Sequence, residues 1–260
     1  VSKETIDDLH AGTKTLVDCP INKIRLGDFS LKSFAVRENE EFVCKSGSFT
    51  LDCNTFIPVN TNKIGEKVNL NQMITIGDGE IAIQVIDILD PDTIKIKILN
   101  NGVIEYMRTF NIPFAEESDQ FIALCKEIFI KTAETEPDFF AISYMDRETN
   151  EKVKKLPELE SQLNKTRMII KIDNTNSVVD MEQLFQDPFY NMVILDRGEL
   201  GVNIPFEKLA IIQKKAILLS KKYNKPLIIS SQILESTISS FIPNRAEVTA
   251  LAEMVWSGVK

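Results

Sequence analysis

Histidine and cysteine, on which much acid–base and zinc chemistry depends, are scarce in this sequence. There is one histidine, His10, and the four cysteines are Cys19, Cys44, Cys53 and Cys125. Catalytic triads and most acid–base mechanisms that use histidine need it beside other reactive groups, and the one histidine here lies in a polar stretch near the amino terminus. We therefore expect no catalytic role for His10. No two cysteines form a Cys-x-x-Cys pair, and the pattern therefore indicates neither a zinc site nor a secreted disulfide framework.

The sequence also lacks an excess of basic residues and lacks long apolar runs. Thirty lysines and arginines face 38 aspartates and glutamates, which gives a net charge of −8 and an isoelectric point near 5.0. Nucleic acids and anionic membranes recruit basic surfaces, so this charge argues against both as partners. No apolar run reaches the roughly 20 residues of a membrane span, and residues 1–12 contain no signal-peptide core. We expect a cytoplasmic protein.

What the sequence does contain is an alternation of apolar, β-branched runs with amphipathic stretches. Such near-continuous apolar runs separated by helices are typical of a parallel sheet covered by helices. The predicted strands are 15–18, 139–144, 168–172, 192–195 and 226–230. The predicted helices are 118–132, 177–186, 205–224 and 244–258.

Between about residues 21 and 111 the sequence consists of short segments in which apolar and polar residues alternate, and turn residues separate these segments. This pattern predicts an all-β insert. Gly-Asp-Gly at 77–79 and Asn-Asn-Gly at 100–102 are hairpin signals inside it. We therefore predict an α/β chain with one barrel part at 1–20, an inserted β domain at 21–111 and a second barrel part at 112–260. The second part holds four of the five predicted strands, and the family resemblance given below implies that these are equivalent to the fourth through seventh strands of a barrel.

Polar residues lie at the carboxyl ends of three of the predicted strands. Enzymes built on parallel sheets place their reacting groups at the carboxyl ends of the strands. Lys171 and Asp173 lie two residues apart on one strand and so face the same side. Glu199 follows the next strand, and two carboxylates from neighbouring strand ends suit Mg²⁺ or Mn²⁺. Structural roles remain open: a solvated Lys171–Asp173 pair, a tight turn at Gly198, or a helix cap at Ser231.

Several of these segments resemble the pyruvate kinase family in both order and spacing. The most specific are Arg-Gly-Glu-Leu-Gly-Val-Asn-Ile-Pro at 197–205, Gln-Ile-Leu-Glu-Ser at 232–236 and Asn-Arg-Ala-Glu at 244–247. Further matching segments are 16–18, 24–25, 77–81 and 169–174. The resemblance implies a TIM barrel interrupted by a β lid domain. It also implies transfer of a phosphoryl group from phosphoenolpyruvate to ADP, with Mg²⁺ or Mn²⁺ and, usually, K⁺.

The resemblance also implies roles for individual residues. The implied catalytic residues are Lys171, near the transferring phosphoryl group, and Ser231, beside the enolate. The implied substrate-binding residues are Gly198, Glu199, Ser231 and Arg25, and the implied metal ligands are Asp173, Glu199 and Asp18. The backbone N–H groups of Gly198 and Glu199 would hold the substrate carboxylate.

Departures from the family keep two alternatives open. The family has Glu and then Asp at the metal pair, where this chain has Asp173 and Glu199. It has an arginine where Asp146 lies, and an aspartate where Ala250 lies. These changes favour, as an alternative, a catalytically impaired subunit with a regulatory or assembly role. A metal-dependent lyase acting on a pyruvate enolate is a third possibility.

The resemblance further implies that barrel strands of the family precede Val1 and follow Lys260. Unpaired edges of a parallel sheet favour association. We therefore expect a homo- or hetero-oligomer, and we expect residues 1–260 expressed alone to be inactive and either poorly soluble or oligomeric.

Overall fold

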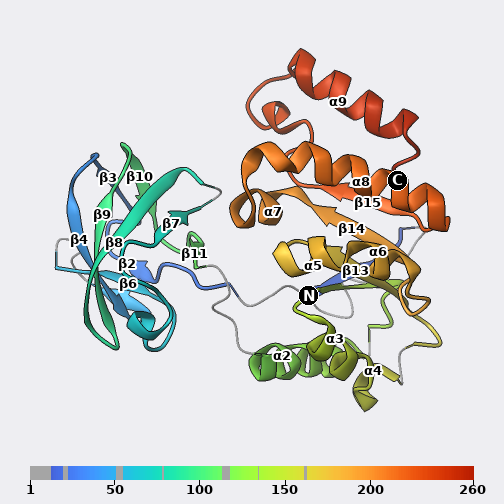
Figure 1. The fold of residues 1–260 in the computed structure, drawn as a ribbon, viewed down its shortest axis with the longest axis horizontal. Coiled ribbons are helices and arrows are strands. Elements are labelled where there is room, and N and C mark those ends of the chain that lie inside the picture. The colour runs from blue at the N-terminus through green and yellow to red at the C-terminus, as the bar shows by residue number, and fades with distance from the viewer. Residues whose placement is uncertain are drawn as a thin grey trace. The chain divides into compact units, whose positions relative to one another are not determined.

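The structure is a computed structural model that describes residues 13–19, 23–50, 55–77, 79–112, 118–133, 135–160 and 163–260. The chain divides into two compact units (Figure 1). Unit 1 comprises Val1–Ile21 and Glu117–Lys260, and unit 2 comprises Asn22–Glu116. None of the helices in the described ranges is long and apolar enough to cross a membrane.

Unit 1 is built on a five-stranded parallel sheet in the order β1-β12-β13-β14-β15. The strands are β1 (Leu16–Cys19), β12 (Phe139–Ser143), β13 (Arg167–Ile172), β14 (Met192–Asp196) and β15 (Leu227–Ser230). The helices are α2 (Ser118–Thr132), α3 (Arg147–Lys154), α4 (Pro157–Glu160), α5 (Thr175–Val179), α6 (Met181–Gln186), α7 (Arg197–Asn203), α8 (Leu209–Tyr223) and α9 (Arg245–Trp256). Two short 3₁₀ helices are η2 (Phe206–Lys208) and η3 (Glu235–Ile238).

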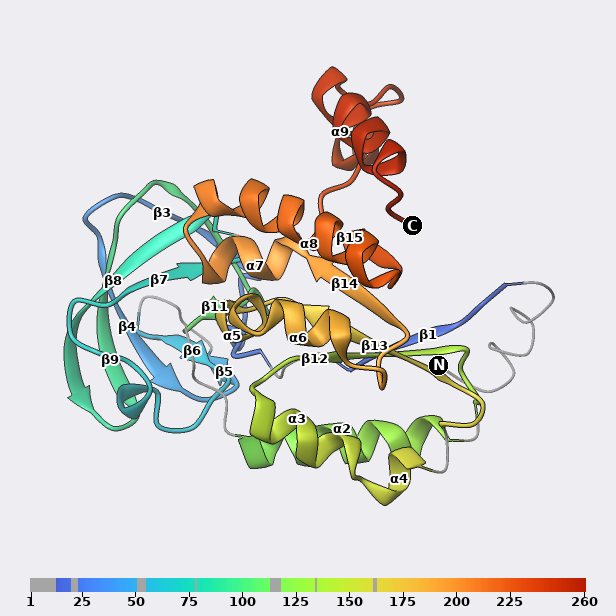
Figure 2. The same ribbon diagram turned by 45° about the vertical axis from the view of Figure 1, so that its right-hand side comes forward.

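Both faces of this sheet carry buried apolar side chains, but the buried cluster on one face is much larger than the cluster on the other. On one face, strand residues such as Phe140, Ile170 and Leu195 join the buried core formed with helices α2, α6 and α8. Figure 2 shows these helices arranged around the sheet. On the opposite face, a smaller buried cluster consists of Ala141, Ile169 and Ile194. The predicted α/β class, with a partial barrel and a β insert, is confirmed.

Local capping explains why the predicted helix at 177–186 is two helices. Asn174 caps α5 with its side chain, and Ser177 returns the bond in a capping box. The N–H of Asp180 then donates to Asn176 O and ends the first helix before α6 begins. The predicted helix at 205–224 likewise begins with the separate turn η2 before α8.

Unit 2 is all β, with a six-stranded sheet in the order β11-β7-β8-β9-β4-β6. Its members are β4 (Glu41–Ser46), β6 (Ile57–Val59), β7 (Met73–Ile76), β8 (Ile81–Asp90), β9 (Thr93–Ile98) and β11 (Phe110–Asn111). Two further pairs join β10 (Gly102–Glu105) to β3 (Ser33–Val36), and β2 (Asp28–Phe29) to β5 (Phe49–Thr50). A 3₁₀ turn, η1, spans Ile64–Glu66, and alternate strand residues fill one apolar core.

One of the two predicted hairpins in unit 2 is confirmed and the other is wrong. Strands β7 and β8 pair antiparallel on either side of 77–79, although Asp78 itself lies outside the described residues. After 100–102, in contrast, β10 pairs with β3 and not with β9. Asn100 instead closes the β7–β8 end: its Oδ1 accepts from Ala82 N at 2.7 Å, and its Nδ2 donates to Glu80 O at 2.8 Å. A Cβ at Gly102 would lie 2.2 Å from Ile81 Cδ1, so glycine serves close packing there.

Candidate site at the carboxyl ends of the unit 1 strands

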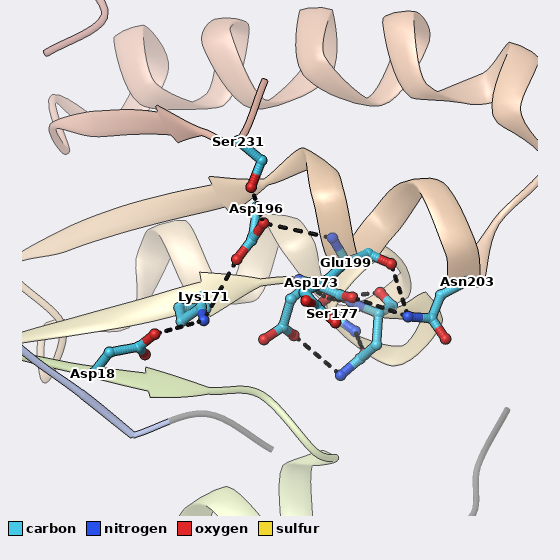
Figure 3. A network of polar contacts seen from close by, with 9 residues as sticks. Asp18, Lys171, Asp173, Ser177, Asp196, Glu199, Asn203 and Ser231 are labelled. Carbon is cyan, nitrogen blue, oxygen red and sulfur yellow. Dashed lines mark hydrogen bonds and ion pairs between the residues drawn. The ribbon is translucent and has the colours of Figure 1, made fainter. Parts of the chain in front are cut away.

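One face of the unit 1 sheet, called the inner face here, carries the small apolar cluster of Ala141, Ile169 and Ile194. Along this face the side chains change from apolar to polar toward the carboxyl ends of the strands. Ile169 on β13 is fully buried, and Lys171 and Asp173 follow it at every second position on the same side. On β14 the corresponding order is Ile194 and then Asp196. Because parallel strands share one direction, these polar side chains meet at one end of the sheet (Figure 3).

Lys171 lies at the centre of this polar end. Its side chain is 7% exposed, and its Nζ lies 3.2 Å from Asp18 Oδ2 and 3.5 Å from Asp196 Oδ2. Burial opposes the charge, yet the pKa of Lys171 lies above its ordinary value, because the carboxylates of Asp18, Asp173 and Asp196 favour the ammonium. The lysine therefore keeps its positive charge in a buried position, which excludes the solvated ion pair considered as a structural role.

Asp173 is the most strongly perturbed carboxyl group of the site. It is 4% exposed, and burial raises its pKa to about 7, with Asp196 and Glu199 adding negative charge. A hydrogen bond with Ser143 and the charge of Lys171 act in the opposite direction. The carboxyl oxygen Oδ1 accepts from Asn174 Nδ2 at 3.2 Å. Near neutral pH this group is consequently divided between its protonated and ionised forms.

Asp196 is shared by three partners, a role that the sequence analysis missed. Its Oδ1 accepts from Ser231 Oγ at 2.8 Å and, as the cap of α7, from Glu199 N at 3.5 Å. Its Oδ2 faces Lys171. The sequence does contain a signal for this role, since Asp196 is the last residue of the strand that pairs with the strand of Lys171.

The loop that carries Ser231 is held in an uncommon backbone conformation. Ser231 and Gln232 have φ values of 72° and 53°, in the left-handed region. Arg197 Nη2 donates to the carbonyl oxygens of these two residues, at 2.6 Å and 3.2 Å respectively. Burial lowers the pKa of Arg197. The two charge-assisted hydrogen bonds from its guanidinium group hold the loop in this conformation. Sequence reasoning missed this positioning role, because only the fold brings Arg197 to the loop.

The remaining predicted site residues are placed as follows. Glu199 is half-buried in the first turn of α7, and the side chain of Asp18 is 48% exposed. Gly198 approaches Ser231 closely, since a Cβ there would lie 3.0 Å from Ser231 Oγ. Arg25 belongs to unit 2, where its Nη1 donates to Met107 O at 3.0 Å. His10 and Cys53 lie outside the described residues.

The contact between Gly198 and Ser231 gives a testable difference between two glycines of α7. Alanine at Gly201 meets nothing within 4 Å, so Gly201→Ala should stabilise the helix by about 0.5–1 kcal/mol. Alanine at Gly198 has the same helix propensity but displaces the Ser231 hydroxyl from Asp196. We expect Gly198→Ala to be less stable than Gly201→Ala by about 1–2 kcal/mol, measured by urea unfolding. Equal stabilities would mean that the Ser231 contact is unimportant.

The acidic residues of the site suit a divalent cation only in part. In the described ranges, no group of three or more histidine, cysteine, aspartate or glutamate side chains forms a complete metal centre. The negative charge of Glu199 nevertheless contributes to the raised pKa of Asp173, so the two carboxyl groups are close enough to interact. Mg²⁺ needs few protein carboxylates when water and substrate oxygens complete its shell, so this donor pair has suitable chemistry.

A cavity of about 300 Å³ elsewhere in unit 1 is a weaker candidate. It lies between α3 and α6, and its lining includes Arg147, Lys154 and Asp187. Lys154 already pairs with Asp187 and, at 2.5 Å, with Glu151. Among the described residues, the strand-end site is therefore the stronger candidate, because Lys171 is buried there and faces Asp18 and Asp196.

The sequence of this chain is similar to those of known proteins. The family described as pyruvate kinase, barrel domain, matches residues 3–260. A pyruvate kinase of Thermotoga maritima is 31% identical over 244 residues, covering 94% of this chain and 51% of that protein. A pyruvate kinase of Buchnera aphidicola is 27% identical over 270 residues, covering 99% of this chain and 54% of that protein. Pyruvate kinase 1 of Saccharomyces cerevisiae is 26% identical over 200 residues, covering 77% and 40%. The chain spans about half the length of such curated relatives.

Proposed function

Because the chain belongs to the pyruvate kinase family, through its barrel domain, we propose that its strand-end site transfers a phosphoryl group from phosphoenolpyruvate to ADP. The observation that carries the proposal is the buried, charged Lys171 at the carboxyl ends of the strands. Phosphoryl transfer depends mainly on positioned cations around spread negative charge. A lysine that stays protonated in a buried site meets that requirement.

Each residue of the site receives a role in this proposal. Lys171 Nζ stabilises the charge that develops on the transferring phosphoryl group. The ion pairs of Lys171 with Asp18 and Asp196 fix the position of its ammonium group. The N–H groups of Gly198 and Glu199 bind the substrate carboxylate, and for Glu199 this replaces its long hydrogen bond to Asp196 Oδ1, which measures 3.5 Å without substrate. Ser231 stands beside the enolate, and its hydroxyl proton is held by Asp196 Oδ1.

The proposed cofactor is Mg²⁺ or Mn²⁺, and the family usually also uses K⁺. Asp173 and Glu199, together with Asp18, are the carboxylates available to hold the divalent ion. When bound, such an ion neutralises charge on the phosphoryl oxygens. Since the pKa of Asp173 is raised to about 7, binding must also displace a proton from this carboxyl group near neutral pH.

The metal assignment predicts that Mn²⁺ binds and that the affinity depends on both carboxylates. Glu199→Gln should weaken binding about tenfold or more, whereas Glu207→Gln, an exposed carboxylate on η2, should leave it unchanged. Affinity should rise with pH up to about 7 as Asp173 loses its proton. Water-proton relaxation measures the bound Mn²⁺.

The exchanged pair Asp173→Glu with Glu199→Asp, which restores the family's arrangement, should bind more tightly than either single variant. The effects are not additive, because the two ligands share one ion. If no Mn²⁺ binds at millimolar concentration in the presence of phosphoenolpyruvate, the metal assignment is wrong.

A second candidate is a catalytically impaired subunit with a regulatory or assembly role, and one observation favours it. Asp146 stands where the family resemblance leads us to expect an arginine, and its carboxylate caps α3. It accepts hydrogen bonds from Thr149 N and Thr149 Oγ1, both at 2.8 Å. A structural cap has therefore taken the place of a substrate-directed cation.

An assay of pyruvate formation by the whole protein separates these functions. Turnover that requires phosphoenolpyruvate, ADP and Mg²⁺ supports the kinase. Binding of phosphoenolpyruvate and Mn²⁺ without turnover supports the impaired subunit. Pyruvate released from a 4-hydroxy-2-oxo acid by cleavage of its carbon–carbon bond, with neither phosphoenolpyruvate nor ADP present, points instead to a lyase.

Exposed apolar side chains support the proposal that the protein forms oligomers. Ile238, Phe241 and Trp256 are 85%, 101% and 84% exposed, around η3 and α9. Large apolar side chains exposed on elements that follow one another in the chain are a feature of protein interfaces. Light scattering of the whole protein measures its oligomeric state.

A further inference from the structure

Two buried cysteines of unit 1 lie in contact although they are distant in sequence. Cys19 is the last residue of β1, and Cys125 lies in α2, 106 positions later. Their Sγ atoms are 3.3 Å apart, and both side chains are 0% exposed. Both are thiols in this structure. A disulfide has an S–S distance of about 2.05 Å, so bond formation requires an approach of roughly 1.3 Å.

The surrounding fold holds the two thiols toward each other. Cys19 pairs with Ile142 in the register of β1 and β12, which fixes its position at the edge strand. Phe121 and Phe129 of α2 are fully buried in the same core and fix the helix face that carries Cys125. The approach needed for a bond therefore depends on rotation of the two side chains and a small shift of α2 on β1.

The position of the pair in the chain gives a bond between them a particular effect. Unit 2, Asn22–Glu116, begins after Cys19 and ends before Cys125. A bond between the two sulfurs would close a covalent loop that contains the whole of unit 2. The two points at which the chain leaves and re-enters unit 1 would then be fastened together.

We propose that Cys19 and Cys125 are a site of oxidative modification at which a hydroperoxide forms an intramolecular disulfide. One thiol attacks a peroxide oxygen, the O–O bond breaks, and a sulfenic acid and water (or an alcohol) are formed. The second thiol then attacks the sulfenic sulfur, the S–O bond breaks, the S–S bond forms, and a second water leaves. Two thiols are oxidised by two electrons, and one hydroperoxide is reduced.

Burial sets the rate of this modification and also its outcome. The oxidant reaches the thiols only when α2 opens locally, so the reaction is slower than that of an exposed thiol. Because the second sulfur is already 3.3 Å away, the sulfenic acid is converted to the disulfide before it is oxidised further. The inference does not depend on the proposed function.

The test is peptide mapping of the whole protein after treatment with hydrogen peroxide. Trypsin separates the cysteines of this chain into four different peptides, 15–23, 38–45, 46–63 and 109–126. After alkylation and digestion without reductant, we expect 15–23 linked to 109–126, at least tenfold more abundant than in dithiothreitol-treated protein. Reduction should release both peptides unmodified.

Variants and a second measurement keep the result decisive. Cys19→Ser and Cys125→Ser should each abolish the linked peptide, whereas Cys44→Ser, which changes a buried thiol of unit 2, should leave it intact. After proteolytic cleavage within unit 2, the oxidised protein should remain one band on a non-reducing gel and separate on reduction. If a serine variant fails to fold, the mapping of the unmodified protein decides.

Two outcomes would overturn the proposal. One is that 15–23 and 109–126 are both recovered alkylated after peroxide has oxidised the other thiols. The other is that either cysteine is found as a sulfinic acid or linked to a different peptide.

Discussion

Replacing Lys171 by methionine is expected to lower turnover about 10²- to 10³-fold in the whole protein, which corresponds to roughly 3–4 kcal/mol of transition-state stabilisation. Methionine approximates the length and volume of the lysine stem but carries no charge. Because a cation aimed at developing charge acts more on the chemical step than on ground-state binding, kcat should fall more than KM rises. The pyruvate-forming assay measures both constants.

Two controls separate this catalytic effect from a structural one. Lys214→Met changes an exposed lysine of α8 and should leave turnover unchanged. Mn²⁺ binding by Lys171→Met should persist, because the carboxylates remain. Turnover equal to that of the unmodified protein would remove Lys171 from the mechanism.

Replacing Asp173 by asparagine is expected to remove the part of the pH dependence of stability that this carboxyl group contributes in the metal-free protein. The folded-state pKa of Asp173 is about 7, against 3.8 for the unperturbed group. Between these values the folded protein binds a proton that the unfolded chain has lost, so the free energy of unfolding decreases as pH rises. Above about pH 7 the loss is complete, at most about 4 kcal/mol.

Between pH 5 and pH 8 the linkage amounts to roughly 2–3 kcal/mol, which Asp173→Asn should abolish. At pH 8 the variant should therefore be more stable than the unmodified protein, and at pH 5 the difference should be much smaller. Urea unfolding with a chelator at both values measures this. Asp119→Asn, an exposed carboxylate of α2, serves as the control. Parallel pH curves for the unmodified and Asp173→Asn proteins would contradict the raised pKa.

The periodicity of apolar residues was sufficient to predict the parallel sheet of unit 1 and the end of the sheet at which Lys171, Asp173 and Asp196 lie. Strands β13 and β14 are buried on both faces, so their sequences are continuous apolar runs. Such runs are typical of parallel strands covered on both sides. Alternation then placed Lys171 and Asp173 on one face. Both conclusions rest on local sequence and the fixed geometry of a strand.

Contacts between distant segments could not be predicted in the same way. Lys171 pairs with Asp18, 153 positions away, and not with its near neighbour Asp173, because the register of three strands decides which carboxylate reaches the ammonium. The pairing of β10 with β3 depends in the same way on tertiary packing, whereas the Asn-Asn-Gly turn signals only a change of direction. The raised pKa of Asp173 follows from complete burial, which no spacing of residues specifies.

The shared carboxylate of Asp196 makes Lys171 and Ser231 thermodynamically coupled, although they lie on different segments and no contact joins them directly. A stronger hydrogen bond from Ser231 Oγ to Oδ1 withdraws electron density from Oδ2, which faces the ammonium. Any event that turns the Ser231 hydroxyl away, including the approach of a substrate oxygen, returns that density to the lysine side. The strand-end site thus responds as a unit, and the free-energy changes of substitutions at its two ends will not sum.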